Sequence, residues 1–186
     1  MNLTDGEPIP SAPVQRIFAA AKFAAEKHSA QRRKGAAAEP YINHLIEVAQ
    51  LISGSSEMLD INLVMAGLLH DTIEDTGTTA QELERLFGSD ITSLVLEVTD
   101  DKSLPKEVRK ALQVQNAPHK SVRAQVIKLA DKISNLRAVL NSPPTTWSAE
   151  RKRQYFAWAQ QVVNALSTPN PVLKAEFDRT IAQFKG

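Results

Sequence analysis

Hydrophobic residues recur along this chain at the three- and four-residue spacing of amphipathic helices, and prolines separate the segments that show it. Ile17, Phe18, Ala21 and Ala25, for example, fall on one face of a helix. Alternation with a period of two is weak, and no Asn-Gly or Asp-Gly turn joins two apolar runs. The pattern predicts an all-α protein of about eight or nine helices, over residues 13–30, 43–52, 60–69, 80–87, 90–98, 105–116, 121–140, 148–167 and 171–184.

The length of 186 residues suits one domain. We expect a loose N-terminal arm over residues 1–12 and a single compact domain over residues 13–186. The chain contains no cysteine, which excludes disulfides, thiolate metal sites and thiol nucleophiles. No apolar run approaches the ~20 residues of a membrane span, and the N-terminus lacks a signal-peptide pattern. We therefore expect a cytoplasmic protein without a membrane partner.

The formal net charge of +1 combines two segments of opposite charge. Residues 57–101 contain eleven acidic residues and one basic residue, whereas residues 102–137 contain nine basic and two acidic residues. A near-neutral total argues against binding an extended polyanion such as nucleic acid. A local group of cations, in contrast, suits a compact phosphorylated ligand.

One predicted helix runs directly into polar residues that are costly to bury. The apolar segment that ends at residue 69 is followed by His70-Asp71-Thr-Ile-Glu74-Asp75. If the helix continues for one more turn, these four polar side chains form one stripe. Three carboxylates placed so closely repel one another unless a cation neutralises them. The alternative is that His70 and Asp71 form only a capped, solvated helix end.

Two further polar residues stand out from their surroundings. His44 lies where the second helix begins, and Asp131 interrupts the apolar segment 126–136. A lone aspartate on such a face more often forms a buried hydrogen bond between helices. With His70 and Asp71, these residues provide two imidazoles and two carboxylates, a set that suits Mn²⁺, Fe²⁺, Zn²⁺ or Mg²⁺. The set leaves positions open on an octahedral ion, as a metal-dependent hydrolase requires.

The order of these residues resembles the HD superfamily of metal-dependent phosphohydrolases. Three segments are similar to the hydrolase domain of RelA/SpoT proteins, and in particular to the small single-domain alarmone hydrolases that resemble the metazoan SpoT homologue. The likeness extends from about residue 14 to residue 167 and implies a compact multi-helix HD-type hydrolase domain for residues 13–186. The three segments are Arg-Arg-Lys to Pro-Tyr-Ile-Asn-His over 32–44, His-Asp-Thr-Ile-Glu-Asp-Thr over 70–76 and Lys-Leu-Ala-Asp-Lys-Ile-Ser-Asn-Leu over 128–136.

The resemblance implies hydrolysis of the 3′-diphosphate of guanosine 3′,5′-bis(diphosphate) and its pentaphosphate analogue (ppGpp and pppGpp). The products would be GDP or GTP and pyrophosphate, which ends the stringent-response signal. It further implies that His44, His70, Asp71 and Asp131 hold one Mn²⁺ ion. Glu74 and Asp75 would act on the attacking water and the leaving group, and either could be the base. The residues expected to bind the nucleotide substrate are Arg33, Lys34, Lys106, Asn135, Arg151 and Tyr155.

Other residues near these segments are given no chemical role. His28 and His119 are expected to be structural or exposed. The loop 35–39 reads Gly-Ala-Ala-Ala-Glu, where relatives usually have a polar, glycine-containing turn. The cations expected to be plain surface residues are Arg32, Lys102, Arg109 and Lys110.

Two other functions fit the same residues. The first is an HD phosphatase that acts on another nucleotide, such as the 2′-phosphate of NADPH. The second is a module that binds alarmones without hydrolysing them, and loss of the ligand residues would be its mark in the sequence. None of the four ligand residues is lost here. The oligomeric state is left open.

Overall fold

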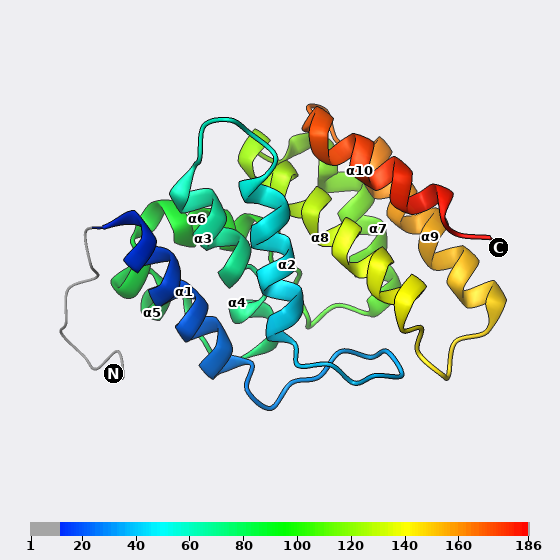
Figure 1. Ribbon diagram of the computed structural model, residues 1–186, viewed down its shortest axis with the longest axis horizontal. Helices are drawn as coiled ribbons and strands as arrows, with labels where there is room; N and C mark the ends of the chain where they lie inside the picture. The colour runs from blue at the N-terminus through cyan, green and yellow to red at the C-terminus, as the bar shows by residue number, and fades with distance from the viewer. Residues whose placement is uncertain (1–11, 186) are drawn as a thin grey trace.

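The structure, a computed structural model, describes residues 12–185, so the expected N-terminal arm lies outside the described residues except for Ala12. Nine helices have eight or more residues, and the described chain forms no β-strand, which confirms the all-α prediction (Figure 1). Within the same residues, no helix is both long and apolar enough to cross a bilayer. The helices are α1 (Pro13–Lys27), α2 (Ile42–Ser53), α3 (Ile61–Leu69), α4 (Thr72–Asp75), α5 (Ala80–Phe87), α6 (Ser89–Val98), α7 (Lys106–Asn116), the 3₁₀ helix η1 (Ala117–His119), α8 (Val122–Asn141), α9 (Ala149–Asn164) and α10 (Pro171–Ala182).

Several helices begin where the sequence predicts, because a polar side chain accepts a hydrogen bond from the backbone of the first turn. Asp60 caps α3, Thr79 caps α5, Ser121 caps α8 and Ser148 caps α9. A cap of this kind contributes about 1 kcal/mol. These local signals explain why the predicted starts agree with the structure.

Two helices end three residues before the predicted positions. α1 ends at Lys27, and α9 ends at Asn164. In both places the chain continues in a tighter turn, with hydrogen bonds from Gln31 N–H to His28 O and from Leu166 N–H to Val163 O. Such turns often follow a helix, and the hydrophobic pattern does not distinguish them from a further helical turn.

The core is centred on α3, whose residues from Leu63 to Leu69 are all buried. α3 packs against α1, α2 and α6, and α8 packs against α2 and α10 (Figure 1). Gly67 allows α2 to approach closely, because a Cβ at this position would lie 2.5 Å from Cδ1 of Ile52. Helices α2, α3 and α8 therefore form a closely packed frame that can hold polar side chains in place.

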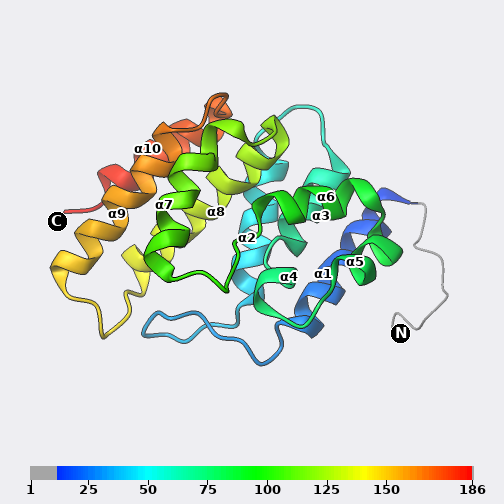
Figure 2. The same cartoon turned by 180° about the vertical axis from the view of Figure 1, so that it is seen from behind.

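Two loops meet at one end of the bundle. The connection between α1 and α2 runs along this end towards the connection between α8 and α9 (Figures 1 and 2). The N–H of Ala37 donates to Oγ of Ser142 at 2.9 Å, and a Cβ on Gly35 would lie 2.1 Å from the carbonyl oxygen of Ser142. Glycine is therefore required at position 35. Ala38 adopts a φ of 46°, a left-handed conformation that favours glycine.

Candidate active site

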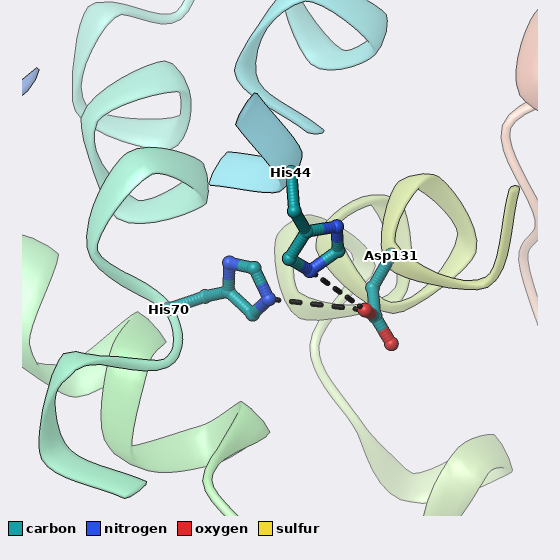
Figure 3. Close-up of side chains that lie close together, drawn as sticks. All are labelled: His44, His70 and Asp131. Atoms are coloured by element: carbon teal, nitrogen blue, oxygen red, sulfur yellow. Dashed lines mark ion pairs between the residues drawn. The ribbon is translucent and has the colours of Figure 1, made fainter. Parts of the chain in front are cut away.

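Three side chains from different parts of the chain meet in the core (Figure 3). His44 lies in the first turn of α2, His70 directly follows α3, and Asp131 lies in the middle of α8. Nε2 of His44 is 3.4 Å from Oδ1 of Asp131, and Nε2 of His70 is 3.8 Å from the same oxygen. One ligand atom from each residue lies within 4.8 Å of the other two, which is the arrangement that a single metal ion requires.

Asp71, the fourth expected ligand, joins this cluster. Its Oδ2 lies 3.1 Å from Nε2 of His70 and 3.6 Å from Nε2 of His44. The same oxygen accepts a 2.6 Å hydrogen bond from the hydroxyl of Tyr41. Burial, reinforced by the charge of Asp71, raises the pKa of Tyr41, so the phenol stays protonated and donates. The structure thus brings the four expected ligand residues together.

The two imidazoles direct nitrogen atoms without hydrogen-bond partners into this cluster. Nδ1 of His70 lies 2.8 Å from the carbonyl oxygen of Gly67. A carbonyl oxygen only accepts, so Nδ1 carries a proton and Nε2 is available as a ligand. Nε2 of His44 and of His70 are both buried and lack a hydrogen-bond partner among the described residues. Since buried polar atoms are nearly always satisfied, these nitrogens and the adjacent carboxylates fit a divalent cation.

The electrostatics of the cluster show the same demand for positive charge. Burial alone would lower the pKa of His70, but Asp71 and Asp131 raise it to about 10. Burial alone would raise the pKa of Asp71, but His70 and His44 hold it well below its usual value. Two carboxylates placed this closely need compensating charge, and a divalent cation held by the imidazoles and carboxylates would supply it.

Neighbours on α8 hold Asp131 in place. Nζ of Lys132 lies 3.0 Å from its Oδ2, and Nδ2 of Asn135 donates to its Oδ1. Lys132 is itself buried, with Nζ 4.6 Å from the centre of the Trp158 ring. The sequence analysis placed Asn135 at the site and missed Lys132. A lysine within an apolar helical segment was the available signal, because lysine is rarely buried without a partner.

The backbone changes direction between α3 and α4, so the polar residues that follow α3 do not continue its helix. α3 ends at Leu69, and the short helix α4 begins at Thr72. A hydrogen bond of 2.8 Å from Asp75 N–H to Asp71 O closes the new turn. The single stripe that a continuous helix would produce is therefore absent, and Glu74 and Asp75 occupy different surroundings.

Glu74 and Asp75 contact different partners. Oε2 of Glu74 accepts a 2.9 Å hydrogen bond from the N–H of Asp100. Oδ2 of Asp75 accepts from Nε2 of Gln31 at 2.7 Å, and its Oδ1 accepts from Lys102. Burial raises the pKa of Glu74, and the N–H of Asp100 only partly opposes this effect. Asp75 is thus held by two side-chain donors, whereas Glu74, which is equally half-buried, accepts from one backbone donor.

A cavity of about 590 Å³ lies beside the cluster, and Asp75 and Tyr41 belong to its wall. This volume is typical of small-molecule sites. The structure also brings together around this one cavity all six residues expected to contact the nucleotide: Arg33, Lys34, Lys106, Asn135, Arg151 and Tyr155.

Three cations given no role in the sequence analysis also line the cavity: Arg32, Lys102 and Lys110. Arg109 does not line it, but its Nη1 lies 4.0 Å from Oε1 of Glu74. The sequence could not separate these cations from ordinary surface residues, because Arg32 and Lys102 lie in loops without a periodic pattern and Lys110 lies on the exposed helix α7.

Four of the cavity cations, Lys34, Lys106, Lys110 and Arg151, lie on the side that we call the outer side of the cavity. They are close enough for the charges of the other three to act on Lys106. Desolvation lowers the pKa of Lys106, and the positive charges of Arg151, Lys110 and Lys34 lower it further. Aromatic rings support these side chains: the guanidinium of Arg151 lies 4.8 Å from the centre of the Trp147 ring. Positive charge gathered in this way favours an anionic ligand.

The two remaining histidines are placed as expected. His28 is buried, and its Nδ1 lies 2.6 Å from Oε1 of Gln31. Its ring stacks on Tyr41 with a centroid separation of 5.1 Å. His119 lies in η1 and is exposed. His28 therefore supports the residues that hold Asp71 and Asp75 and does not join the cluster itself.

Comparison with known proteins relates this geometry to a family. The chain is 49% identical over 162 residues to guanosine-3′,5′-bis(diphosphate) 3′-pyrophosphohydrolase MESH1 of Xenopus tropicalis, covering 87% of this chain and 90% of the relative. It is 50% identical over 159 residues to the MESH1 of Homo sapiens, covering 86% and 89%. A solved structure described as a metazoan orthologue of SpoT that hydrolyses ppGpp and plays a role in starvation responses matches with a TM-score of 0.87 and 45% identity, covering 95% of this chain and 98% of that one.

The protein-family model described as the HD domain matches residues 20–163 of this chain. This match confirms the resemblance inferred from the sequence motifs. Together with the cluster of His44, His70 and Asp131, it indicates a site for a divalent metal ion. Because the matched region spans well over half of the residues, the chain belongs to the HD domain family.

Proposed function

We propose that this protein hydrolyses the 3′-diphosphate of guanosine 3′,5′-bis(diphosphate) and of its pentaphosphate analogue, releasing pyrophosphate and leaving GDP or GTP. The observation that carries the proposal is the buried cluster of two histidines and two aspartates beside a cation-lined cavity of about 590 Å³. The relatives of about 50% identity named for this activity support it. In a cell that makes these nucleotides, the reaction would end the stringent-response signal.

The reaction defines what the site must supply. Water adds a hydroxyl group to the phosphorus bound to the ribose 3′ oxygen, the bond between that phosphorus and the oxygen breaks, and the oxygen takes up a proton. The site must therefore activate water, neutralise phosphate charge and protonate the leaving oxygen.

We propose that His44, His70, Asp71 and Asp131 hold one divalent ion, and that this ion is Mn²⁺, as the family resemblance implies; Mn²⁺ accepts both imidazole nitrogen and carboxylate oxygen. Zn²⁺, Fe²⁺ and Mg²⁺ are the alternatives to be compared in the assay. When bound, such an ion lowers the pKa of a coordinated water and polarises a phosphoryl oxygen. Tyr41 and Lys132 then keep the two aspartates oriented through the hydrogen bonds described above.

The different surroundings of Glu74 and Asp75 support different roles. We assign the base to Glu74, because burial raises its pKa and its Oε1 has no hydrogen-bond partner among the described residues. Lys102 and Arg109 approach this oxygen only to 3.9 and 4.0 Å. Asp75 is engaged on both oxygens by Gln31 and Lys102. It would hold Lys102 at the cavity, close to the phosphate groups.

The outer side of the cavity would bind the nucleotide. Arg33, Lys34, Lys106 and Arg151 provide positive charge for the two diphosphates, and Tyr155 and Asn135 provide polar contacts. The guanidinium of Arg33 lies 5.9 Å from the centre of the Tyr41 ring, so a planar group already borders the cavity for a purine base to stack upon.

The proposal is tested by incubating metal-depleted protein with guanosine 3′,5′-bis(diphosphate), with and without added Mn²⁺, and measuring pyrophosphate and GDP. We expect stoichiometric release that depends on the ion, and parallel reactions with Zn²⁺, Fe²⁺ and Mg²⁺ rank the metals. A parallel reaction with NADPH, in which released phosphate is measured, tests the alternative that the enzyme removes the 2′-phosphate of that nucleotide. Turnover of NADPH alone would overturn the assignment of the substrate, and tight calorimetric binding of the alarmone without turnover would identify a binding module instead.

A further inference from the structure

We infer that Glu47 is a positioning residue, which acts through Ser134 to fix the proton of His44 on Nδ1 and so leaves Nε2 available to the metal. The inference rests on the metal site of the proposed function but not on the nature of the nucleotide. Among the hydrogen bonds of the described residues, the link from Glu47 and Ser134 to the cluster runs through His44.

The observation is a chain of hydrogen bonds between α2 and α8. His44 and Glu47 lie three residues apart on α2, and Ser134 and Arg137 lie three residues apart on α8, so each pair faces the other. Nδ1 of His44 lies 2.8 Å from Oγ of Ser134, which is fully buried. Oγ of Ser134 donates to Oε2 of Glu47 at 2.6 Å, and Nη1 of Arg137 donates to Oε1 of Glu47 at 3.0 Å.

Counting the protons shows which group donates in each of these hydrogen bonds. Oε1 of Glu47 accepts from Arg137 and Oε2 accepts from Ser134, so both carboxylate oxygens act as acceptors. The single hydroxyl proton of Ser134 is then directed to Glu47. Oγ of Ser134 can only accept from His44, so the imidazole proton lies on Nδ1. The same tautomer is imposed on His70 by the carbonyl of Gly67.

The two histidines differ in how easily this control can be removed. His70 depends on a backbone carbonyl, which no substitution deletes. His44 depends on two side chains, and Arg137 is in turn held by Glu176 of α10. Without an acceptor at position 47, the hydroxyl of Ser134 becomes free to donate to Nδ1 of His44. The proton of the imidazole would then move to Nε2, where it opposes metal binding.

The test compares Glu47→Leu and Ser134→Ala with Glu176→Leu as the matched control. Glu176→Leu makes the same substitution at the far end of this series of hydrogen bonds, beyond Arg137, and leaves Glu47, Ser134 and His44 unchanged. Dissociation constants for Mn²⁺ are measured by calorimetry in the absence of nucleotide. We expect binding to weaken by about 10- to 100-fold for the first two variants, as for other partners of ligand histidines, and by less than about twofold for the control. Circular dichroism confirms that each variant is folded.

The tautomer itself is read by NMR on [¹⁵N]histidine-labelled protein loaded with diamagnetic Zn²⁺. In the wild type we expect a proton on Nδ1 of His44 that exchanges slowly with solvent, and faster exchange or loss of this signal in Ser134→Ala. Coordination through Nδ1 in the wild type would overturn the inference. So would wild-type Mn²⁺ affinity in both Glu47→Leu and Ser134→Ala, or in the one that folds if the other does not.

These measurements separate the inference from the proposed function. If the protein binds Mn²⁺ as described but releases no pyrophosphate from the alarmone, the proposed function fails and the role of Glu47 stands. If pyrophosphate is released and both variants bind Mn²⁺ like the wild type, the proposed function stands and the role of Glu47 fails.

Discussion

The two sides of the cavity are built from very different parts of the molecule. On the inner side, the cluster lies between α2, α3 and α8, and α3 has every residue from Leu63 to Leu69 buried. On the outer side, the cations come from the loop 28–41, α7 and the start of α9, and none of the eleven residues of α7 is buried. The core thus fixes the reacting groups, while more exposed elements provide the charge that binds substrate.

This difference predicts how substitutions divide between catalysis and binding. Groups on the inner side act at the reacting bond, so their loss lowers kcat. Groups on the outer side contact parts of the substrate that do not react, so their loss raises KM. An element with few buried side chains also opens more readily, which suits entry of a ligand.

The largest effect is expected for Asp131→Asn. The substitution keeps the shape of the side chain but removes a carboxylate charge from the metal cluster. We expect Mn²⁺ affinity and kcat to fall by more than about 100-fold, beyond the loss typical of outer partners of metal ligands. Calorimetry and the pyrophosphate assay measure the two quantities. An unchanged kcat would place the reacting groups elsewhere.

A loss of about 100-fold or more in kcat/KM is expected for Glu74→Gln, the usual contribution of a general base. Since burial raises the pKa of Glu74, the wild-type rate should rise with pH through an apparent pKa above the ordinary value of 4.5. The check is a pH–rate profile of both proteins. The fall in rate at low pH, the acid limb of the profile, should disappear in the variant. If the limb persists in Glu74→Gln, the base is another group.

The same substitution is expected to stabilise the fold. The raised pKa means that the folded protein holds the Glu74 proton more tightly than the unfolded chain does. This contribution to stability is fully present below the unfolded pKa and is lost as the pH rises through the folded pKa. Glu74→Gln should therefore have a higher Tm than the wild type at neutral pH, and the difference should shrink in acid. Thermal melts of both metal-free proteins, from neutral to acid pH, measure this difference in Tm. An equal or lower Tm of the variant at neutral pH would contradict the prediction.

A smaller effect, on KM rather than kcat, is expected for Lys106→Ala on the outer side. Lys106 is exposed but sits among other cations at the cavity. Its loss should raise KM by about three- to tenfold, less than for a buried charged pair, and the effect should weaken in high salt. Lys174→Ala on α10 removes a lysine paired with Asp178 and serves as the control. A fall in kcat at constant KM would contradict the division between the two sides.

The smallest effect concerns the loop between α1 and α2. Ala38 has a φ of 46°, so Ala38→Gly relieves backbone strain and should stabilise the protein by about 0.5–1 kcal/mol. Ala37→Gly, where no positive φ exists, should be neutral or destabilising. Chemical denaturation of both variants measures the difference. Equal destabilisation by both would show that the left-handed turn is absent in solution.

Sequence and structure agree best where the signal is local or chemically unusual. Helix starts followed from capping residues such as Asp60 and Ser148, and the four cluster residues followed from polar groups set against apolar helices. The end of α3 at Leu69 agrees with the predicted helix, but the separate helix α4 was not predicted, because it depends on the backbone path after Leu69. Lys132 and Glu47 were also missed, since their roles come from contacts between side chains brought together only by folding.

The central claim, that the inner cluster directs water to the phosphorus of the 3′-diphosphate, is tested most directly by the reaction in H₂¹⁸O. The protein is supplied with Mn²⁺ and guanosine 3′,5′-bis(diphosphate), and the products are analysed by mass spectrometry. We predict one GDP and one pyrophosphate per substrate, with ¹⁸O in the pyrophosphate and none in GDP. Release of orthophosphate instead of pyrophosphate, ¹⁸O in GDP, or no Mn²⁺-dependent turnover would contradict the account.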